Sequence, residues 1–208
     1  MLNKSILAAG IGLLLSAAAA QAIPITTLPP ELIASGNVTA VYVFADAGDS
    51  SILNELTPVP FPQIFCNHTI IGTCTGNNAG DTKSLFPPSQ TGPMVFSLQD
   101  VTSGNLFTSN SADVNGNYHV RITSNYADFG LGALPGAAAT ALTGLPGSIT
   151  YIGWEDLTAA QNSDFDYNDL IFAFVNTSIR VPEPLTLSLF GAGIAGAALL
   201  RRRKAKSA

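Results

Sequence analysis

Five carboxylates stand close together between residues 155 and 169, and an asparagine lies among them. In an extended segment the Cα atoms of Asp164, Asp166 and Asn168 fall on one side, about 6.5 Å apart. Two carboxylates about 5 Å apart repel by roughly 3 kcal/mol at an effective dielectric near 20. Calcium offsets such repulsion by binding six to eight oxygen atoms. We therefore expect a calcium site formed by Glu155, Asp156, Asp164, Asp166, Asn168 and Asp169.

The spacing of this segment matches only the start of an EF-hand calcium loop. In an EF-hand the sixth position is glycine and the twelfth is a bidentate glutamate. Here those positions hold Asp169 and Val175, so we expect a calcium site on a loop between strands instead. The alternative is a tight turn in which Asp164 and Asn168 bond backbone amides while the other side chains face water.

Hydrolysis is a second chemistry that paired carboxylates allow. A glycosidase needs two carboxyl groups roughly 5–9.5 Å apart across a cleft, and this loop offers such pairs. The chain has one tryptophan, Trp154, and no aromatic-rich cleft pattern. A serine hydrolase would have to recruit His68 or His119, and no Gly-x-Ser-x-Gly motif occurs. We predict no enzyme and assign no catalytic residues, with a secreted glycan hydrolase as the alternative.

The two cysteines, Cys66 and Cys74, stand close together in the segment CNHTIIGTC. A disulfide between them would close a short loop and contribute about 2–3 kcal/mol to stability. The alternative is a fragment of a zinc site with His68. A structural zinc needs four ligands, and His119 is the only other histidine. The spacing therefore favours the disulfide.

These candidate sites are carried by a chain that is typical of β-structure. Short runs rich in Val, Ile, Phe, Tyr and Thr predict strands at residues 37–45, 94–99, 117–124, 149–154 and 169–175. Clusters of Gly, Pro, Asn and Asp separate them, and a helical turn or two is expected around residues 137–142. We therefore predict an all-β fold, an antiparallel β-sandwich or jelly-roll-like domain over residues 23–180.

The N-terminus is typical of a secretory signal peptide. Lys4 precedes an apolar stretch over residues 6–15, and Ala20-Gln21-Ala22 provides the small-residue pattern of a signal peptidase site. We expect residues 1–22 to be removed, so that the mature chain starts at Ile23. The alternative is an uncleaved anchor helix.

The C-terminus combines a short motif, an apolar helix and a basic end. The motif is Val181, Pro182, Glu183 and Pro184, and the tail over residues 201–208 begins with Arg201, Arg202, Arg203 and Lys204. Between them residues 185–200 carry no charge, and as a helix they would span about 24 Å, a marginal transmembrane length. Basic residues stay on the cytoplasmic side, which predicts that the body of the protein lies outside the cytoplasm.

The segment over residues 181–208 resembles the PEP-CTERM sorting signal of Gram-negative bacteria. The resemblance rests on the Pro-Glu-Pro motif, the apolar helix rich in small residues and the arginine-rich end. It implies transient anchoring in the inner membrane, processing by an exosortase-type enzyme, and release to the cell surface or into the exopolysaccharide of a biofilm matrix.

A second resemblance covers the body of the chain. The stretch WEDL, followed by DFDYNDLIFAF, is similar to the C-terminal signature of an exported bacterial family known as domain of unknown function 4114. The likeness extends over residues 38–177, where NYHVRITSN resembles a middle strand. It implies a β-rich extracytoplasmic module of surface proteins, stabilised by calcium. Tyr167 inside the motif and the glycine-poor TAAQNS before it depart from the family pattern.

The charge of the predicted exported body limits its partners. Residues 23–184 hold 14 acidic and 3 basic residues, a net charge of about −11, against −5 for the whole chain. Such a body repels nucleic acid and anionic lipid and attracts cations. We therefore expect an exported surface or matrix protein with a calcium-stabilised domain. The alternative binding function is a carbohydrate-binding or adhesive module of the exopolysaccharide matrix.

Overall fold

The computed structural model of the protein describes residues 23–86 and 89–181. The predicted signal peptide and the segment from Pro182 onward, including the predicted transmembrane helix at residues 185–200, lie outside these described residues. No helix within the described ranges is long and apolar enough to cross a membrane.

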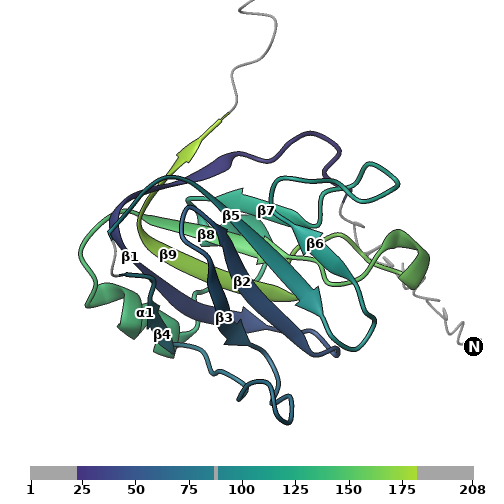
Figure 1. The fold of residues 1–208 in the computed structure, drawn as a ribbon, viewed down its shortest axis with the longest axis horizontal. Coiled ribbons are helices and arrows are strands. Elements are labelled where there is room, and N and C mark those ends of the chain that lie inside the picture. Colours follow the sequence, from purple (N-terminus) through teal and green to yellow (C-terminus); the bar gives the residue numbers. More distant parts are fainter. Residues whose placement is uncertain (1–22, 87–88, 182–208) are drawn as a thin grey trace, which may run out of the picture.

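The described residues form an antiparallel β fold with little helix, which confirms the predicted all-β class (Figure 1). The strands are β1 (Glu31–Ala45), β2 (Ser51–Thr57), β3 (Phe61–Cys66), β4 (Thr82–Ser84), β5 (Gln90–Asp100), β6 (Leu106–Thr108), β7 (Val120–Thr123), β8 (Ile149–Trp154) and β9 (Leu170–Arg180). The helices are the 3-10 turns η1 (Tyr126–Phe129) and η2 (Ala159–Gln161) and the α-helix α1 (Gly136–Thr143).

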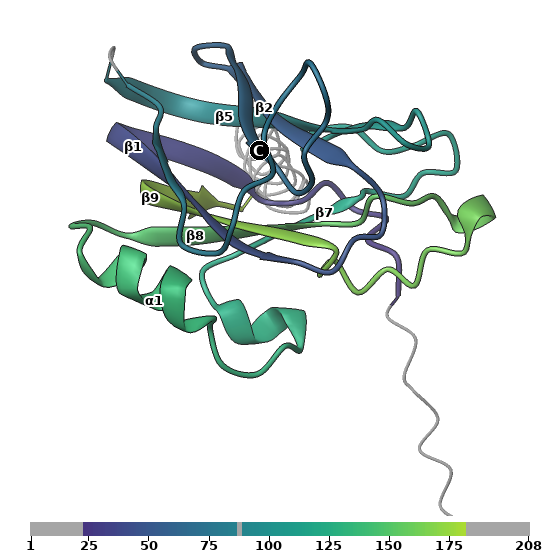
Figure 2. The ribbon, with the colours of Figure 1, turned by 90° about the horizontal axis from the view of Figure 1, so that it is seen from below.

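The strands are hydrogen-bonded in the order β3-β2-β5-β1-β9-β8-β7, with β4 on β1 and β6 on β5. The start of β5 pairs with the start of β1, from Gly36↔Gln90 to Leu32↔Met94, whereas the rest of β5 pairs with β2. Beyond this shared corner the sheet divides into two layers, with β2 and β5 over the layer that contains β1, β9 and β8 (Figure 2).

The strand β9 explains the run of hydrophobic residues that follows the acidic segment. Because successive side chains of a strand point to opposite faces, Leu170, Phe172 and Phe174 enter the core between the two layers. Ile171, Ala173 and Val175 enter a second core on the other face. A strand buried on both faces needs a continuous apolar run instead of an alternating one.

The second core lies under the helices that cover the outer face of the β8 and β9 layer (Figure 2). Ala138 and Leu142 of α1 and Tyr126 and Phe129 of η1 pack there. The helix α1 confirms the helical turns expected around residues 137–142 and extends them by one residue at each end.

Gly153 in β8 permits a close approach at this face. A Cβ atom at Gly153 would collide with the Phe129 ring and with the carbonyl oxygen of Tyr167. The backbone of the acidic loop therefore lies directly against the strand β8, where only glycine leaves room for it.

Cys66 and Cys74 form the predicted disulfide, with a sulfur–sulfur distance of 2.04 Å. This contradicts the alternative of a zinc fragment, because both sulfur atoms are consumed by the disulfide. The Nδ1 atom of His68 instead lies 3.1 Å from the carbonyl oxygen of Asp49. His119 is buried, and its Nε2 atom lies 3.2 Å from a carboxylate oxygen of Asp113.

Candidate cation site

The acidic residues meet at one end of the β8–β9 pair. Trp154, the last residue of β8, is paired with Leu170, the first residue of β9. Glu155 and Asp156 follow the first of these strands and Asp169 precedes the second, so antiparallel pairing brings them together. The chain between them contains η2 and then Asp164 and Asp166.

Three of the predicted ligands converge. Each of Glu155, Asp164 and Asp166 offers a carboxylate oxygen, and these oxygens lie within 4.8 Å of one another. Glu155 is only 2 % exposed, and its Oε2 atom has no hydrogen-bond partner. Asp166 is half-buried and Asp164 is exposed, so the group is closed on the protein side and open toward solvent.

The backbone of this loop turns its aromatic and acidic side chains in different directions. Phe165 and Tyr167 adopt positive φ angles of 56° and 63°, and both rings are buried in the second core. The Asp166 amide donates to Asp164 Oδ1 at 3.4 Å, and the Asn168 amide donates to Asp166 Oδ1 at 3.0 Å. In the turn alternative, the Asn168 side chain would bond a backbone amide. In the structure, its side-chain amide instead donates to a carboxylate oxygen of Asp166.

Tyr167 anchors the loop. Its hydroxyl donates to the Tyr118 carbonyl at 3.2 Å and accepts from the Ile25 amide at 2.7 Å. The guanidinium of Arg121 lies 4.8 Å from the centre of its ring. These contacts fix the backbone between Asp166 and Asn168, so the tyrosine positions the neighbouring carboxylate.

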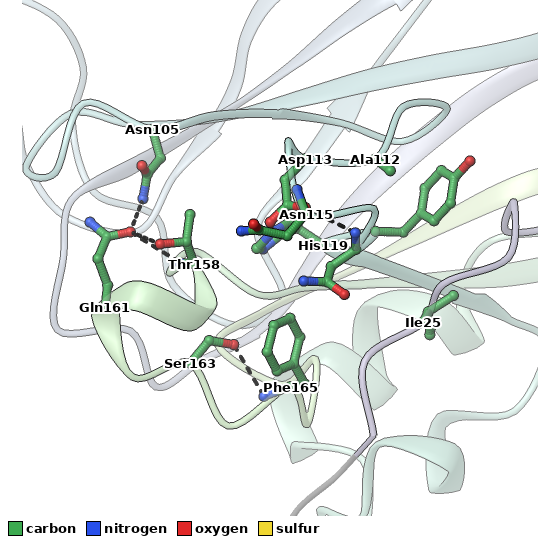
Figure 3. Close-up of polar contacts among 12 residues, drawn as sticks. Ile25, Asn105, Ala112, Asp113, Asn115, His119, Thr158, Gln161, Ser163 and Phe165 are labelled. Atoms are coloured by element: carbon green, nitrogen blue, oxygen red, sulfur yellow. Dashed lines mark hydrogen bonds and ion pairs between the residues drawn. The ribbon is translucent and has the colours of Figure 1, made fainter.

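The first half of the loop is held by an amide network (Figure 3). The Thr158 amide and hydroxyl donate to Gln161 Oε1 at 3.0 and 2.8 Å, which closes the turn η2. Asn105, from the segment before β6, donates through Nδ2 to Gln161 Oε1 at 2.9 Å and to the Asp156 carbonyl at 3.1 Å. The Ser163 hydroxyl accepts the Phe165 amide at 3.3 Å.

Without a cation the carboxylates oppose ionisation of one another. Burial, followed by the charge of Asp169, raises the pKa of Glu155 to about 8. Burial is also the largest cause of the raised pKa of Asp166, with the charges of Asp164 and Asp169 adding to it. A divalent cation at this position would favour the ionised forms and remove both penalties.

The other three predicted ligands have different surroundings. Asn168 orients Asp166. Asp169 Oδ2 accepts the Asp156 amide at 3.0 Å, and the charge of Asp169 contributes to the raised pKa of both Glu155 and Asp156. Asp156 is not a member of the converging group, because consecutive residues beyond a strand end point in different directions.

Sequence reasoning missed two acidic residues, Asp49 and Asp100, whose charges act on Asp156. Burial, followed by Asp169, raises the pKa of Asp156 to about 7, and the charges of Asp100 and Asp49 contribute. Both aspartates are distant from residue 156 in the sequence, and neither belongs to a local motif. Only the pairing of strands brings them to this end of the sandwich.

Comparison of the chain with protein-family models, with curated proteins and with solved structures finds no match. Within the described residues, the geometry shows one group of carboxylates that could hold a metal ion, formed by Glu155, Asp164 and Asp166.

Proposed function

We propose that this chain is an exported β domain of the cell surface or extracellular matrix, stabilised by calcium at Glu155, Asp164 and Asp166. The observation that supports the proposal best is the buried Oε2 atom of Glu155, which has no partner and belongs to a carboxylate that faces two others. A buried oxygen of this kind is costly unless it is protonated or bound to a cation.

The chemistry of the ligands favours calcium over zinc. The converging groups are all carboxylates, whereas structural zinc sites use cysteine and histidine ligands. Calcium accepts irregular arrangements of six to eight oxygen atoms and completes its shell with backbone carbonyls and water. The exposed Asp164 leaves one side of the position open to water.

A calcium ion at this position would fasten the loop between β8 and β9 to the sheet. Glu155 continues the buried strand β8, while Asp164 and Asp166 belong to the far part of the loop. Binding to the folded state alone stabilises it by about 2.7 kcal/mol when calcium is at 100 times its dissociation constant. Extracellular modules bind calcium with dissociation constants of about 0.1–1 mM, which suits a protein outside the cell.

The proposed location rests on the terminal segments. The predicted signal peptide at residues 1–22 and the predicted PEP-CTERM-like tail at residues 181–208 support export, transient membrane anchoring, and processing by signal peptidase and an exosortase-type enzyme. Exopolysaccharide is the proposed surrounding material, and the acidic body disfavours nucleic acid as a partner.

The burial of Glu155 favours a structural cation over glycan hydrolysis. A general acid must reach the glycosidic oxygen of its substrate, but Glu155 is only 2 % exposed. Burial and the charge of Asp169 are enough to explain the high pKa of Glu155, so this pKa does not require a role as a general acid.

The proposal is tested by melting the protein in EDTA and in millimolar calcium. We expect calcium at 100 times its dissociation constant to raise the midpoint by roughly 5–10 °C. The double variant Asp164→Asn/Asp166→Asn should lose this increment. Asp46→Asn, which removes an exposed carboxylate from another loop, should keep it. Equal midpoints for the unmodified protein in EDTA and calcium would show that the proposal is wrong.

A further inference from the structure

The N-terminal segment over residues 23–30 is bonded to the loop that carries the candidate cation site. It forms an isolated β-bridge in which Ile25 pairs with Tyr118, shortly before the edge strand β7. The Tyr118 amide donates to the Ile25 carbonyl at 2.8 Å, and the Ile25 amide donates to the Tyr167 hydroxyl at 2.7 Å. Ile25 therefore attaches this segment both to the sheet and to the acidic loop.

The attachment of this segment depends on Ile25. Three of its eight residues are prolines, which have no amide hydrogen to donate. Among the residues that the structure describes, both hydrogen bonds of the segment are made by Ile25. The Ile25 side chain also packs against the second core. One of the two hydrogen bonds that hold the segment therefore goes to Tyr167.

Tyr167 connects the segment to the proposed calcium ligands. It is fully buried, and its hydroxyl also donates to the Tyr118 carbonyl at 3.2 Å. The three residues Ile25, Tyr167 and Tyr118 thus form a closed ring of hydrogen bonds. Because Asp166 directly precedes Tyr167 in the chain, a displacement of the buried tyrosine also displaces this carboxylate.

The backbone of the acidic loop needs this support from its surroundings. Phe165 and Tyr167 both hold positive φ angles, a conformation that non-glycine residues keep only where neighbouring structure holds them. Their rings enter the second core, while Asp164 and Asp166 alternate with them along the chain. The bond from Ile25 is one of the contacts that keep the Tyr167 ring in place, and with it the direction of the Asp166 side chain.

We propose that residues 23–30 act as a strap that positions Asp166 for calcium, with Tyr167 as the positioning residue. This inference rests on the proposed function. By thermodynamic linkage, the factor by which the docked strap raises calcium affinity is also the factor by which bound calcium favours docking of the strap. The strap begins at Ile23, which is 82 % exposed. Proteolytic loss of the strap therefore weakens calcium binding.

The dissociation constant for calcium tests the proposal, measured by isothermal titration calorimetry of the full-length protein with calcium chloride. Tyr167→Phe keeps the ring and removes the hydroxyl, and Ile25→Pro removes the amide hydrogen. We expect each change to raise the dissociation constant about two- to tenfold, the equivalent of one hydrogen bond. Two controls should leave it unchanged: Ile25→Val keeps the amide, and Tyr126→Phe removes a hydroxyl from the same core.

Hydrogen exchange gives a second readout of the same coupling. In the unmodified protein, the amides of residues 23–30 should exchange more slowly in calcium than in EDTA, because bound calcium favours the docked strap. In Tyr167→Phe, calcium should have little effect on this exchange. Equal rates in calcium and EDTA for the unmodified protein would overturn the coupling.

The outcomes separate this inference from the proposed function. If the unmodified protein binds calcium and Tyr167→Phe and Ile25→Pro bind it equally well, the strap only stabilises the fold, and the inference is wrong while the proposed function stands. If the unmodified protein binds no calcium, the proposed function is wrong and the inference falls with it. The same conclusion follows if Asp164→Asn/Asp166→Asn binds calcium as tightly as the unmodified protein.

Discussion

Replacing Glu155 by glutamine should change stability in opposite directions with and without calcium. Glutamine keeps the shape of the side chain but carries no charge. In metal-free protein the change removes a buried group that resists ionisation, which is stabilising near neutral pH. In calcium it removes a charged ligand, so the variant loses stabilisation that the unmodified protein gains.

The metal-free effect follows from the pKa of Glu155. Burial and the Asp169 charge raise this pKa from 4.5 to about 8 in the folded protein. A raised pKa contributes stability that is complete below the unfolded value and is lost as the pH rises toward the folded value. Each pH unit above 4.5 costs about 1.4 kcal/mol, so the loss at pH 7 is about 3 kcal/mol. Glutamine avoids this loss, which corresponds to a midpoint roughly 6–12 °C higher in EDTA.

The assay is thermal unfolding followed by circular dichroism at pH 5 and pH 7, in EDTA and in millimolar calcium. In EDTA we expect Glu155→Gln to exceed the unmodified protein at pH 7 and nearly to match it at pH 5, where little of the loss has developed. The rise in thermal midpoint that calcium produces should be much smaller for Glu155→Gln than for the unmodified protein. Asp46→Asn removes an exposed carboxylate and should show neither effect.

Two outcomes would refute this reasoning. A Glu155→Gln protein that is less stable than the unmodified protein in EDTA at pH 7 would show that the buried carboxylate does not destabilise the metal-free fold. A calcium increment equal to that of the unmodified protein would show that Glu155 is not a ligand.

Two further predictions concern residues that support the fold. Burial raises the pKa of Glu55 to about 7, although Gln90 donates a hydrogen bond to its carboxylate. The free energy of unfolding should therefore fall between pH 4.5 and pH 7, and the urea midpoint of Glu55→Gln should fall less over this range than that of the unmodified protein. An equal fall in both proteins would contradict this prediction. Gly153→Ala should cost about 1–3 kcal/mol in urea unfolding and weaken calcium binding, because the new methyl group displaces Tyr167. Gly48→Ala has open space, and an equal cost there would contradict the close approach at Gly153.

The strands that sequence reasoning found are those with strong local signals. The predicted strand at residues 149–154 coincides with β8. The predicted strand at residues 169–175 starts one residue before β9 and ends five residues short of it, because β9 continues to Arg180. The segment 94–99 is part of the longer β5, and 117–124 contains the shorter β7. The strand predicted at 37–45 begins earlier, at Glu31, because β1 continues through Gly36 with a register shift.

The strands β2, β3, β4 and β6 were missed for a physical reason. β3 contains Pro62 and a positive φ at Gln63, and β2 carries Asn54 and Glu55 in its centre. Such segments have weak strand propensity. β2 and β4 become strands through hydrogen bonds to β5 and β1, which are distant from them in the sequence, whereas β3 pairs with β2 and β6 pairs with β5.

The sequence by itself determined the β class, the disulfide and the segment that carries the acidic loop, because these depend on residue type and short spacing. The tertiary structure decided which carboxylates meet. It separates Glu155 from Asp156 and brings Asp49 and Asp100 toward the latter. Local patterns act through a few neighbouring backbone units, whereas the convergence of oxygen atoms depends on strand pairing and on the side of the sandwich that each loop reaches.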